Sequence, residues 1–280
     1  MRIRLDDLVA SRLAEGAAVP AFTCYDFTTA LAVVSAAEEV GQGVIILITP
    51  KTASMKEGLR LVAAVRALAD AAVVPVAVQL DHAPNLDLIL SAVAAGADSV
   101  LADASAAPFA DNVAFVRHVR SATDALGVVV EAELGSIAGD EDRSLAVEAS
   151  GKTDSLLVAE FVASSHAQLL ATSVGNVHGS YAGVPKLDWP LISDVRAASP
   201  VPLSLHGASG LPDEDLRRAP AAGLGKINFN TELRAAIFDA VEAQLSASRA
   251  TGDDMLAYER ACREAVRQFT LSTLEKLAGR

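Results

Sequence analysis

The stretch VPVAVQLDHAPNLDLILSAVAAGADSVLA, residues 74–102, has the pattern of a strand, a helix and a second strand. Val74–Leu80 is an aliphatic run that ends at two polar residues, and Asp98–Ala102 is a second short run of the same kind. Between them, Leu86–Ala95 carries apolar residues at three- and four-residue spacing, which is the period of an amphipathic helix. The stretch therefore predicts a βαβ unit whose two strands are parallel and buried on both faces.

The same alternation continues along the chain and predicts its fold class. Helical periodicity recurs at Leu59–Ala69 and Ala110–Ala122. The other strand-like runs are Val19–Cys24, Gly43–Thr49, Val128–Glu133, Leu169–Val174, Val201–Leu205 and Lys226–Phe229. Parallel strands that are each followed by a helix favour an α/β fold, here a (β/α)8 TIM barrel, over an open doubly wound sheet. We expect residues 1–280 to form a single such domain, with an extra C-terminal helix from Asp253 to Arg280 and a mobile, irregular loop at Ser136–Thr153.

The net charge, the lengths of the apolar runs and the cysteine content indicate which classes of binding partner and which cellular compartment to expect. The net charge is −12 and no basic cluster offers a face for a phosphate backbone, so we expect no nucleic-acid partner. The longest aliphatic runs, such as Val44–Ile48, are far shorter than the ~20 residues that span a bilayer, so we expect no membrane partner. Cys24 and Cys262 form neither a CxxC zinc motif nor a disulfide framework, which fits a cytoplasmic protein.

Three histidines stand where a strand-like run gives way to a loop: His82, His178 and His206. The carboxyl ends of barrel strands share one rim and neutral imidazoles are common zinc ligands, so three strand-end histidines favour one shared metal site. Taken singly, each could equally be a histidine with ordinary hydrogen-bond partners. His118 and His166 fall in helix-like stretches, where a surface or packed histidine is expected.

Two groups of carboxylates accompany these histidines. Glu131 and Glu133 lie two residues apart at the end of a strand, so their side chains share one side of the pleat. We expect one or both to face the barrel interior or mouth, where they could occupy a second metal position, orient a histidine ligand, or only pair with a lysine or arginine. Asp140, Glu141 and Asp142 lie in the predicted loop, where a solvated charge run is the default interpretation.

Two segments near the end of the predicted barrel are typical of phosphate-binding loops. Gly207–Gly210 follows the seventh strand, and Asn228–Thr231 ends the eighth and leads into a helix. Barrels often bind phosphate at these positions with backbone N–H groups and a helix N-terminus. Asn230 or Thr231 could instead only cap that helix, and the two roles can coexist. We favour phosphate binding.

The order of these motifs is similar to that of a known family. In chain order they are Leu80-Asp-His82, Val130-Glu-Ala-Glu-Leu-Gly135, His178-Gly-Ser-Tyr181 with Pro185-Lys-Leu-Asp188, His206-Gly-Ala-Ser-Gly210 and Lys226-Ile-Asn-Phe-Asn-Thr231. Together with the tail helix that contains Arg260, they resemble the class II, zinc-dependent fructose-bisphosphate and tagatose-bisphosphate aldolases over nearly the whole chain. Motifs of this length and order are specific for the family and much less so for the sugar.

The resemblance implies a role for each candidate residue. The Zn²⁺ ligands would be His82, His178 and His206. Glu133 would lie near a second metal position, Glu141 would remove the C3 proton of dihydroxyacetone phosphate, and Asp81 would protonate the aldehyde oxygen. A Na⁺ or K⁺ ion would lie near the phosphate loops, and the protein would be a homodimer or homotetramer. The residues that would bind the phosphorylated substrate are Gly179, Gly207, Ala208, Ser209, Asn228, Phe229, Asn230, Thr231 and Arg260.

The chain departs from the family pattern in the segments of the implied aldehyde pocket. Thr23 and Asp26 stand where relatives have asparagines, Thr49-Pro-Lys51 replaces serine-proline-glycine, and Gln79 replaces a histidine. We therefore hypothesise that the aldehyde acceptor differs from glyceraldehyde 3-phosphate. Arg260, which in relatives can reach a neighbouring subunit's second phosphate, is present and argues for the usual acceptor.

The residues leave three other classes open. A Schiff-base aldolase would need a lysine on the rim, for which Lys226 is the candidate, and it would survive EDTA but be trapped by borohydride. A metal-dependent hydrolase on the same fold would need no base for the C3 proton. A non-catalytic paralogue could retain the metal and phosphate loops without using Asp81 in any chemistry.

Overall fold

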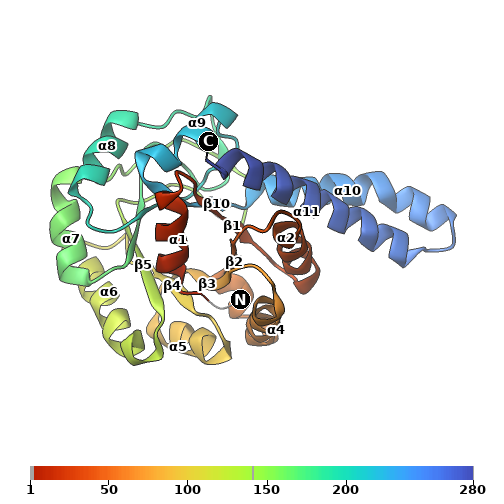
Figure 1. The fold of residues 1–280 in the computed structure, drawn as a ribbon, viewed down its shortest axis with the longest axis horizontal. Helices are drawn as coiled ribbons and strands as arrows, with labels where there is room; N and C mark the ends of the chain where they lie inside the picture. Colours follow the sequence, from red (N-terminus) through yellow and green to blue (C-terminus); the bar gives the residue numbers. More distant parts are fainter. Residues whose placement is uncertain (1–2, 141, 280) are drawn as a thin grey trace.

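The computed structural model describes residues 3–140 and 142–279. Parallel strands close into a barrel in the order β1-β10-β9-β7-β5-β4-β3-β2, as Figure 1 shows. These strands are β1 Val19–Thr23, β2 Val44–Ile48, β3 Val76–Ala83, β4 Ser99–Ala102, β5 Val129–Leu134, β7 Leu169–Thr172, β9 Leu203–Leu205 and β10 Leu224–Phe229. Each coincides with one of the predicted runs, so the prediction of a TIM barrel is confirmed.

Helices alternate with the strands and cover the outside of the barrel (Figure 1). They are α1 Leu5–Ala14, α2 Phe27–Val40, α3 Pro50–Ala53, α4 Gly58–Ala71, α5 Leu86–Ala95, α6 Phe109–Thr123, α7 Val158–Ser165, α8 Trp189–Ala198, α9 Asp213–Arg218, α10 Thr231–Ala250 and α11 Met255–Leu277. Single 3₁₀ turns cover Asp124–Leu126, Ser155–Leu157 and Pro220–Ala222. Every helix in the described ranges is too short or too polar to cross a lipid bilayer.

Alternation along the strands sorts their side chains into two layers. In β3, Val78 and Leu80 pack in the outer layer against the helices, whereas Ala77 packs in the interior. Near the amino ends of the strands the interior is aliphatic, and α1 covers it with Leu5 and Leu8. The next interior positions are buried but polar: Gln79, Asp81, Glu131, Glu133, Ser204, Lys226 and Asn228. The barrel therefore places a polar site at the carboxyl ends of its strands.

The C-terminal part of the chain forms two long helices, α10 and α11, that project from the barrel as a pair (Figure 1). The predicted extra helix from Asp253 to Arg280 is observed as α11, Met255–Leu277. It begins where the Asp254 side chain accepts a hydrogen bond from the Ala257 N–H, which satisfies one of the unpaired donors at the helix start.

The segment Ser136–Thr153 is less irregular than predicted. Within it, β6 (Ala146–Val147) pairs in parallel with β8 (Ser180–Tyr181). The prediction of an unstructured loop is wrong at these residues, because the pairing partner comes from a distant part of the sequence. His166 also differs from expectation, since it does not lie within α7 but follows its last residue with a left-handed φ of 60°.

Candidate metal centre and active site

Three histidine side chains meet at the carboxyl end of the barrel. His82 lies near the end of β3, His206 directly follows β9, and His178 lies between β7 and β8. The His82 ring centroid is 4.8 Å from that of His178 and 4.8 Å from that of His206, and the latter two are 6.0 Å apart. One nitrogen of each ring lies within 4.8 Å of one nitrogen of the other two. The structure therefore brings together the three histidines that the sequence spacing singled out.

A bulge in β3 brings two consecutive side chains to this site. In a regular strand, Asp81 and His82 would face opposite sides of the sheet. The pairing of β3 with β4 shifts register between Leu80 and Ala83, and His82 has a φ of 43°, which side chains rarely adopt. Asp81 thus stays inside the barrel while His82 turns toward the mouth. Backbone strain of this kind is typical of functional sites.

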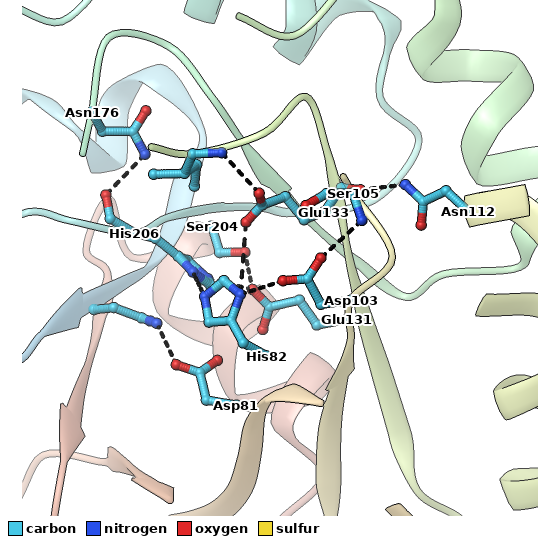
Figure 2. A network of polar contacts seen from close by, with 12 residues as sticks. Asp81, His82, Asp103, Ser105, Asn112, Glu131, Glu133, Asn176, Ser204 and His206 are labelled. Carbon is cyan, nitrogen blue, oxygen red and sulfur yellow. Dashed lines mark hydrogen bonds and ion pairs between the residues drawn. The ribbon is translucent and has the colours of Figure 1, made fainter. Parts of the chain in front are cut away.

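Two carboxylates hold the outer nitrogens of two of the rings (Figure 2). His82 Nδ1 is 2.7 Å from Asp103 Oδ2, and His206 Nε2 is 2.9 Å from Glu131 Oε1. Because a carboxylate accepts hydrogen bonds, the proton of each neutral ring lies on that outer nitrogen. The inner nitrogens, His82 Nε2 and His206 Nδ1, then direct lone pairs at each other across 2.8 Å. Two lone pairs this close repel each other unless both face a cation beside them, so the donor set fits a divalent metal ion.

The electrostatic surroundings of two of the three rings, those of His178 and His206, favour the neutral form. Burial lowers the pKa of His178, and the other two histidines of the cluster lower it further. Burial also lowers the pKa of His206, and the Lys226 charge acts in the same direction, while Glu131 partly offsets both effects. Neutral imidazole is the form that binds metal, so these shifts favour metal binding at neutral pH.

Glu131 is the centre of a fully buried network beneath the histidines. Its carboxylate accepts hydrogen bonds from Ser204 Oγ at 2.5 Å and from Gln79 Nε2 at 2.8 Å, and it forms an ion pair with Lys226 Nζ at 2.9 Å. Burial alone would raise the pKa of Glu131, but the Lys226 charge and the hydrogen bond with His206 outweigh it and hold the pKa well below its usual value. Glu131 is therefore an ionised group that orients His206.

The same network argues against Lys226 as a Schiff-base lysine. A Schiff-base mechanism needs an unprotonated amine that the substrate carbonyl can reach. Lys226 is 0% exposed, and its Nζ atom is paired with Glu131 inside the barrel. Lys226, the lysine that the sequence analysis named for this chemistry, therefore has a structural role as the ion-pair partner of Glu131.

A second group of possible metal ligands, His82, Asp103 and Glu133, adjoins the first. Glu133 Oε1 accepts a hydrogen bond from the Ile137 N–H at 3.1 Å. No described residue donates to its buried Oε2, which lies 3.9 Å from His82 Nδ1. A buried carboxylate oxygen without a donor fits a position next to a cation. Asp103 is absent from the sequence-based site, although it directly follows β4 and meets the same strand-end criterion as the histidines.

The buried carboxyl of Glu133 predicts how the metal-free protein responds to pH. Burial raises the pKa of Glu133 to about 8, an effect that His82 partly offsets and Asp103 increases. Between the ordinary value of 4.5 and about 8, the native state binds this proton and the unfolded chain does not, so raising the pH destabilises the fold. The free energy of unfolding should fall by up to about 1.4 kcal/mol per pH unit over this range. Urea unfolding of the metal-free wild type and of Glu133→Gln tests this, because the substitution should remove the Glu133 contribution to the slope; parallel pH profiles would contradict the assignment.

Asp81 lies next to the histidine cluster inside the barrel (Figure 2). Its side chain is fully buried, and Asn228 Nδ2 donates a hydrogen bond to its Oδ2 at 3.2 Å. No described residue binds its Oδ1. The carboxyl group is therefore held in place through one oxygen while the other is available for proton transfer at the site.

A small cavity beside His178 gathers most of the residues predicted to bind phosphate. Its lining is His178, Gly179, Gly207, Ser209, Asn228, Asn230 and Thr231. α10 begins here at Thr231, and the Asn230 side chain makes no capping bond to it but donates to Tyr25 Oη at 3.1 Å. Gly207 has a φ of 60°, and a side chain there would collide with the Val177 carbonyl oxygen. A glycine-rich backbone and the N-terminus of a long helix suit an anion.

Three of the residues predicted to bind the substrate, Ala208, Phe229 and Arg260, do not line this cavity. The Phe229 side chain faces outward into the core under the helices, so only its backbone can contribute, and Ala208 is fully buried. Arg260 lies on α11, in the projecting helix pair (Figure 1), where its Nε donates to the Leu256 carbonyl at 3.2 Å. Glu141 lies outside the described residues.

A larger cavity of about 580 Å³ opens on the other side of His178. Its lining includes His82, Asp103, Glu133, Thr49, Lys51, Asp140 and Asp142. The volume is in the range of small-molecule sites. From the sequence, Lys51 is named only as a departure from the family pattern, and Tyr25 is not predicted as a site residue. Tyr25 contacts Asp142, which lies more than a hundred residues away in the sequence, so no local pattern indicates the contact.

The chain matches the family model "Fructose-bisphosphate aldolase class-II" over residues 3–279. It belongs to the class II fructose-bisphosphate aldolase family. This aldolase is 41% identical over 237 residues to the D-tagatose-1,6-bisphosphate aldolase subunit GatY of Klebsiella oxytoca, an alignment that covers 84% of this chain and 82% of that protein.

Solved structures agree with this assignment. The YdjI aldolase of Escherichia coli K12 superposes with a TM-score of 0.86 at 30% identity and covers 100% of this chain and 98% of its own. The fructose-bisphosphate aldolase of Campylobacter jejuni has a TM-score of 0.82, with coverage of 99% and 95%, and at 24% identity it supports the fold alone. The resemblance seen in the sequence is confirmed, and the protein is a lyase of the aldolase type. The family is metal-dependent, and the histidine cluster of this aldolase could bind a metal ion.

Proposed function

We propose that this aldolase is zinc-dependent and catalyses reversible aldol addition and cleavage between dihydroxyacetone phosphate and an aldehyde. The names of the family model and of the GatY relative support a ketose 1,6-bisphosphate, fructose or tagatose bisphosphate, as the substrate. The observation that carries the proposal is the convergence of His82, His178 and His206 beside a cavity at the N-terminus of α10.

The histidine cluster would hold the catalytic Zn²⁺, and Glu133, with Asp103, would provide the second metal position. A bound divalent ion supplies Lewis-acid polarisation of the substrate's carbonyl and hydroxyl oxygens. The protein's own contribution is to fix the ligands, because Asp103 and Glu131 hold the outer nitrogens of His82 and His206.

Two carboxyl groups would move the protons. Glu141 would remove the C3 proton of dihydroxyacetone phosphate, and Asp81 would protonate the aldehyde oxygen as the carbon–carbon bond forms. In cleavage, Asp81 takes that proton back from the hydroxyl group. Asn228 keeps one Asp81 oxygen in place, so that the other can face the reacting oxygen.

The phosphate group would bind in the small cavity. Backbone N–H groups of the glycine-rich segments and the N-terminus of α10 would neutralise it, together with the side chains of Ser209, Asn230 and Thr231. The net charge of −12 makes such local donors necessary for an anionic substrate.

A second candidate concerns the acceptor aldehyde. Thr49 and Lys51, where the chain departs from the family pattern, both line the larger cavity. An acceptor other than glyceraldehyde 3-phosphate is therefore the alternative. Condensation of dihydroxyacetone phosphate with a panel of aldehydes separates the two, because a strong preference for glyceraldehyde 3-phosphate would refute the altered acceptor.

Chelation and borohydride together test the chemical class. EDTA treatment should lower ketose bisphosphate cleavage at least about a hundredfold, since metal-ion catalysis contributes several kcal/mol, and added Zn²⁺ should restore it. Sodium borohydride with dihydroxyacetone phosphate should leave the protein mass unchanged. An enzyme that retains its activity in EDTA and gains a covalent adduct at a lysine would overturn the proposal.

The proposal also includes the domain organisation, the oligomeric state and a monovalent cation site. Residues 1–280 would act as one domain in a homodimer or homotetramer, in which Arg260 on the projecting helices would reach the site of a neighbouring copy. A Na⁺ or K⁺ ion would bind near the phosphate loops.

A further inference from the structure

Residues 137–140 and 142–147 form a segment that is tied to the site from one side, and Ile137, Gly139, Asp140 and Asp142 line the larger cavity. The His178 N–H donates to the Ala138 carbonyl at 2.8 Å, and Gly139 pairs with His178. Gly139 has a φ of 115°, and a side chain there would collide with the His178 carbonyl oxygen. This segment, called the rim loop below, therefore runs directly against a predicted metal ligand.

Lys51 ties the rim loop to the opposite side of the mouth. Its Nζ is 3.0 Å from Asp140 Oδ1 and 2.9 Å from Asp142 Oδ2. Lys51 belongs to the short helix α3, which the Thr49 side chain caps by accepting a hydrogen bond from the Thr52 N–H. One cation on a fixed helix thus binds the two residues that flank position 141 in the sequence. Arg143 also approaches Asp140, at 4.0 Å, but both residues belong to the rim loop, so this pair does not tie the loop to another element.

Tyr25 adds a third contact to the same short segment. Its hydroxyl donates to Asp142 Oδ1 at 2.9 Å and accepts a hydrogen bond from Asn230 Nδ2 at 3.1 Å. Asn230 lines the cavity proposed for phosphate. A continuous chain of hydrogen bonds therefore runs from that cavity to the rim loop.

We propose that Lys51, supported by Tyr25, is a positioning residue that anchors both chain neighbours of Glu141 to the rim and so positions the base of the reaction. This inference rests on the proposed function, which assigns that base to Glu141. Lys51 stands at a position where the chain departs from the family pattern, so its part in the anchor is a property of this chain's own sequence.

The arrangement of the contacts explains why exposed ion pairs can matter here. A single exposed pair contributes little, and the Lys51 side chain is 66% exposed. Two ion pairs and a hydrogen bond from a half-buried tyrosine, however, act on two residues only two positions apart, Asp140 and Asp142, so that ordering one contact helps to order the next. The hydrogen bonds with Asp142 and Asp140 raise the pKa of Lys51, which keeps the ammonium charged. A base displaced by about 1 Å can lose roughly a hundredfold in rate, so a modest anchor has a measurable effect.

The test compares Lys51→Ala with Lys56→Ala in the zinc-loaded protein. Lys56 is an exposed lysine five residues further along the same connection, so its replacement removes the same charge without removing the anchor. One readout is amide hydrogen exchange of residues 139–147, and the other is tritium release from C3 of dihydroxyacetone phosphate without any aldehyde. The second readout excludes effects on acceptor binding.

Lys51→Ala is expected to accelerate amide exchange in the rim loop about threefold or more and to slow tritium release about tenfold, with unchanged zinc content and unchanged KM for dihydroxyacetone phosphate. Lys56→Ala should match the wild type in every readout, and Lys51→Arg should recover most of the rate because a guanidinium can bind both carboxylates. Salt should slow the wild type and leave Lys51→Ala unaffected, since exposed pairs are screened.

Each contrary result has a distinct meaning. Unchanged amide exchange in Lys51→Ala would overturn the anchor itself. Faster amide exchange with an unchanged rate of tritium release would overturn its positioning role. Absence of tritium release in the wild type would refute the proposed function, and the positioning role with it, while the amide-exchange comparison would still decide whether Lys51 holds the rim loop.

Discussion

Replacement of Asp81 by asparagine is expected to slow ketose bisphosphate cleavage by about 10²–10⁴-fold, which is the usual contribution of a general acid or base. Asparagine has the same shape, so it can keep a hydrogen bond with Asn228, but it cannot carry the proton to or from the hydroxyl group. Tritium release from C3 of dihydroxyacetone phosphate should remain within about threefold of the wild type, because Glu141 would perform that step. The two assays therefore separate the two proton transfers.

The control for this prediction is the metal content of the variant. Asp81 directly precedes His82, so a displaced ligand would lower zinc binding and both assays together. Zinc content equal to that of the wild type with only cleavage impaired supports Asp81 as the acid. Cleavage at the wild-type rate would remove Asp81 from the mechanism.

Loss of His206 is expected to have an equally large effect. His206→Gln should lower cleavage at least about 10³-fold and weaken zinc binding, because the ring supplies one of three converging nitrogens. Glutamine preserves much of the volume of this fully buried side chain, and thermal unfolding should confirm that the variant is folded. The matched control is His118→Gln, a histidine on the exposed face of α6, which should behave as the wild type.

The supporting carboxylate should show a smaller effect of the same kind. Glu131→Gln removes the charge that orients His206 and that pairs with Lys226, and such groups typically contribute 10–100-fold in metal affinity. A competition titration with a zinc-sensitive dye measures this. If His206→Gln and Glu131→Gln both bind zinc with the affinity of the wild type, His206 is not a ligand.

The barrel could be predicted from the sequence because its strands are buried on both faces. Continuous aliphatic runs such as Val44–Ile48, separated by amphipathic helices, are compatible with few folds other than a parallel sheet that helices cover. The polar side chains inside the barrel could be predicted only in part. The spacing of Glu131 and Glu133 places them on one side of a strand, but the pairing of Glu131 with Lys226 joins strands 95 residues apart in the sequence, as their numbers show.

The parts that sequence reasoning missed depend on irregular or distant geometry. Asp103 directly follows a strand, as His206 does, so the same strand-end argument predicts that it lies at this rim of the barrel. The bulge that turns His82 toward the mouth has no local pattern, because alternation along β3 would place it outside. β6 is only two residues long and forms because Ser180 and Tyr181 lie beside it in the fold.

X-ray absorption at the zinc edge of the metal-loaded protein tests whether the three histidines bind one zinc ion. We expect one zinc ion with scattering from three imidazole rings, which His82, His178 and His206 supply. Replacing any one of these histidines should lower the number of imidazoles or abolish stoichiometric binding. A zinc ion that binds with no imidazole ligand, or with the same spectrum after all three replacements, would contradict the account.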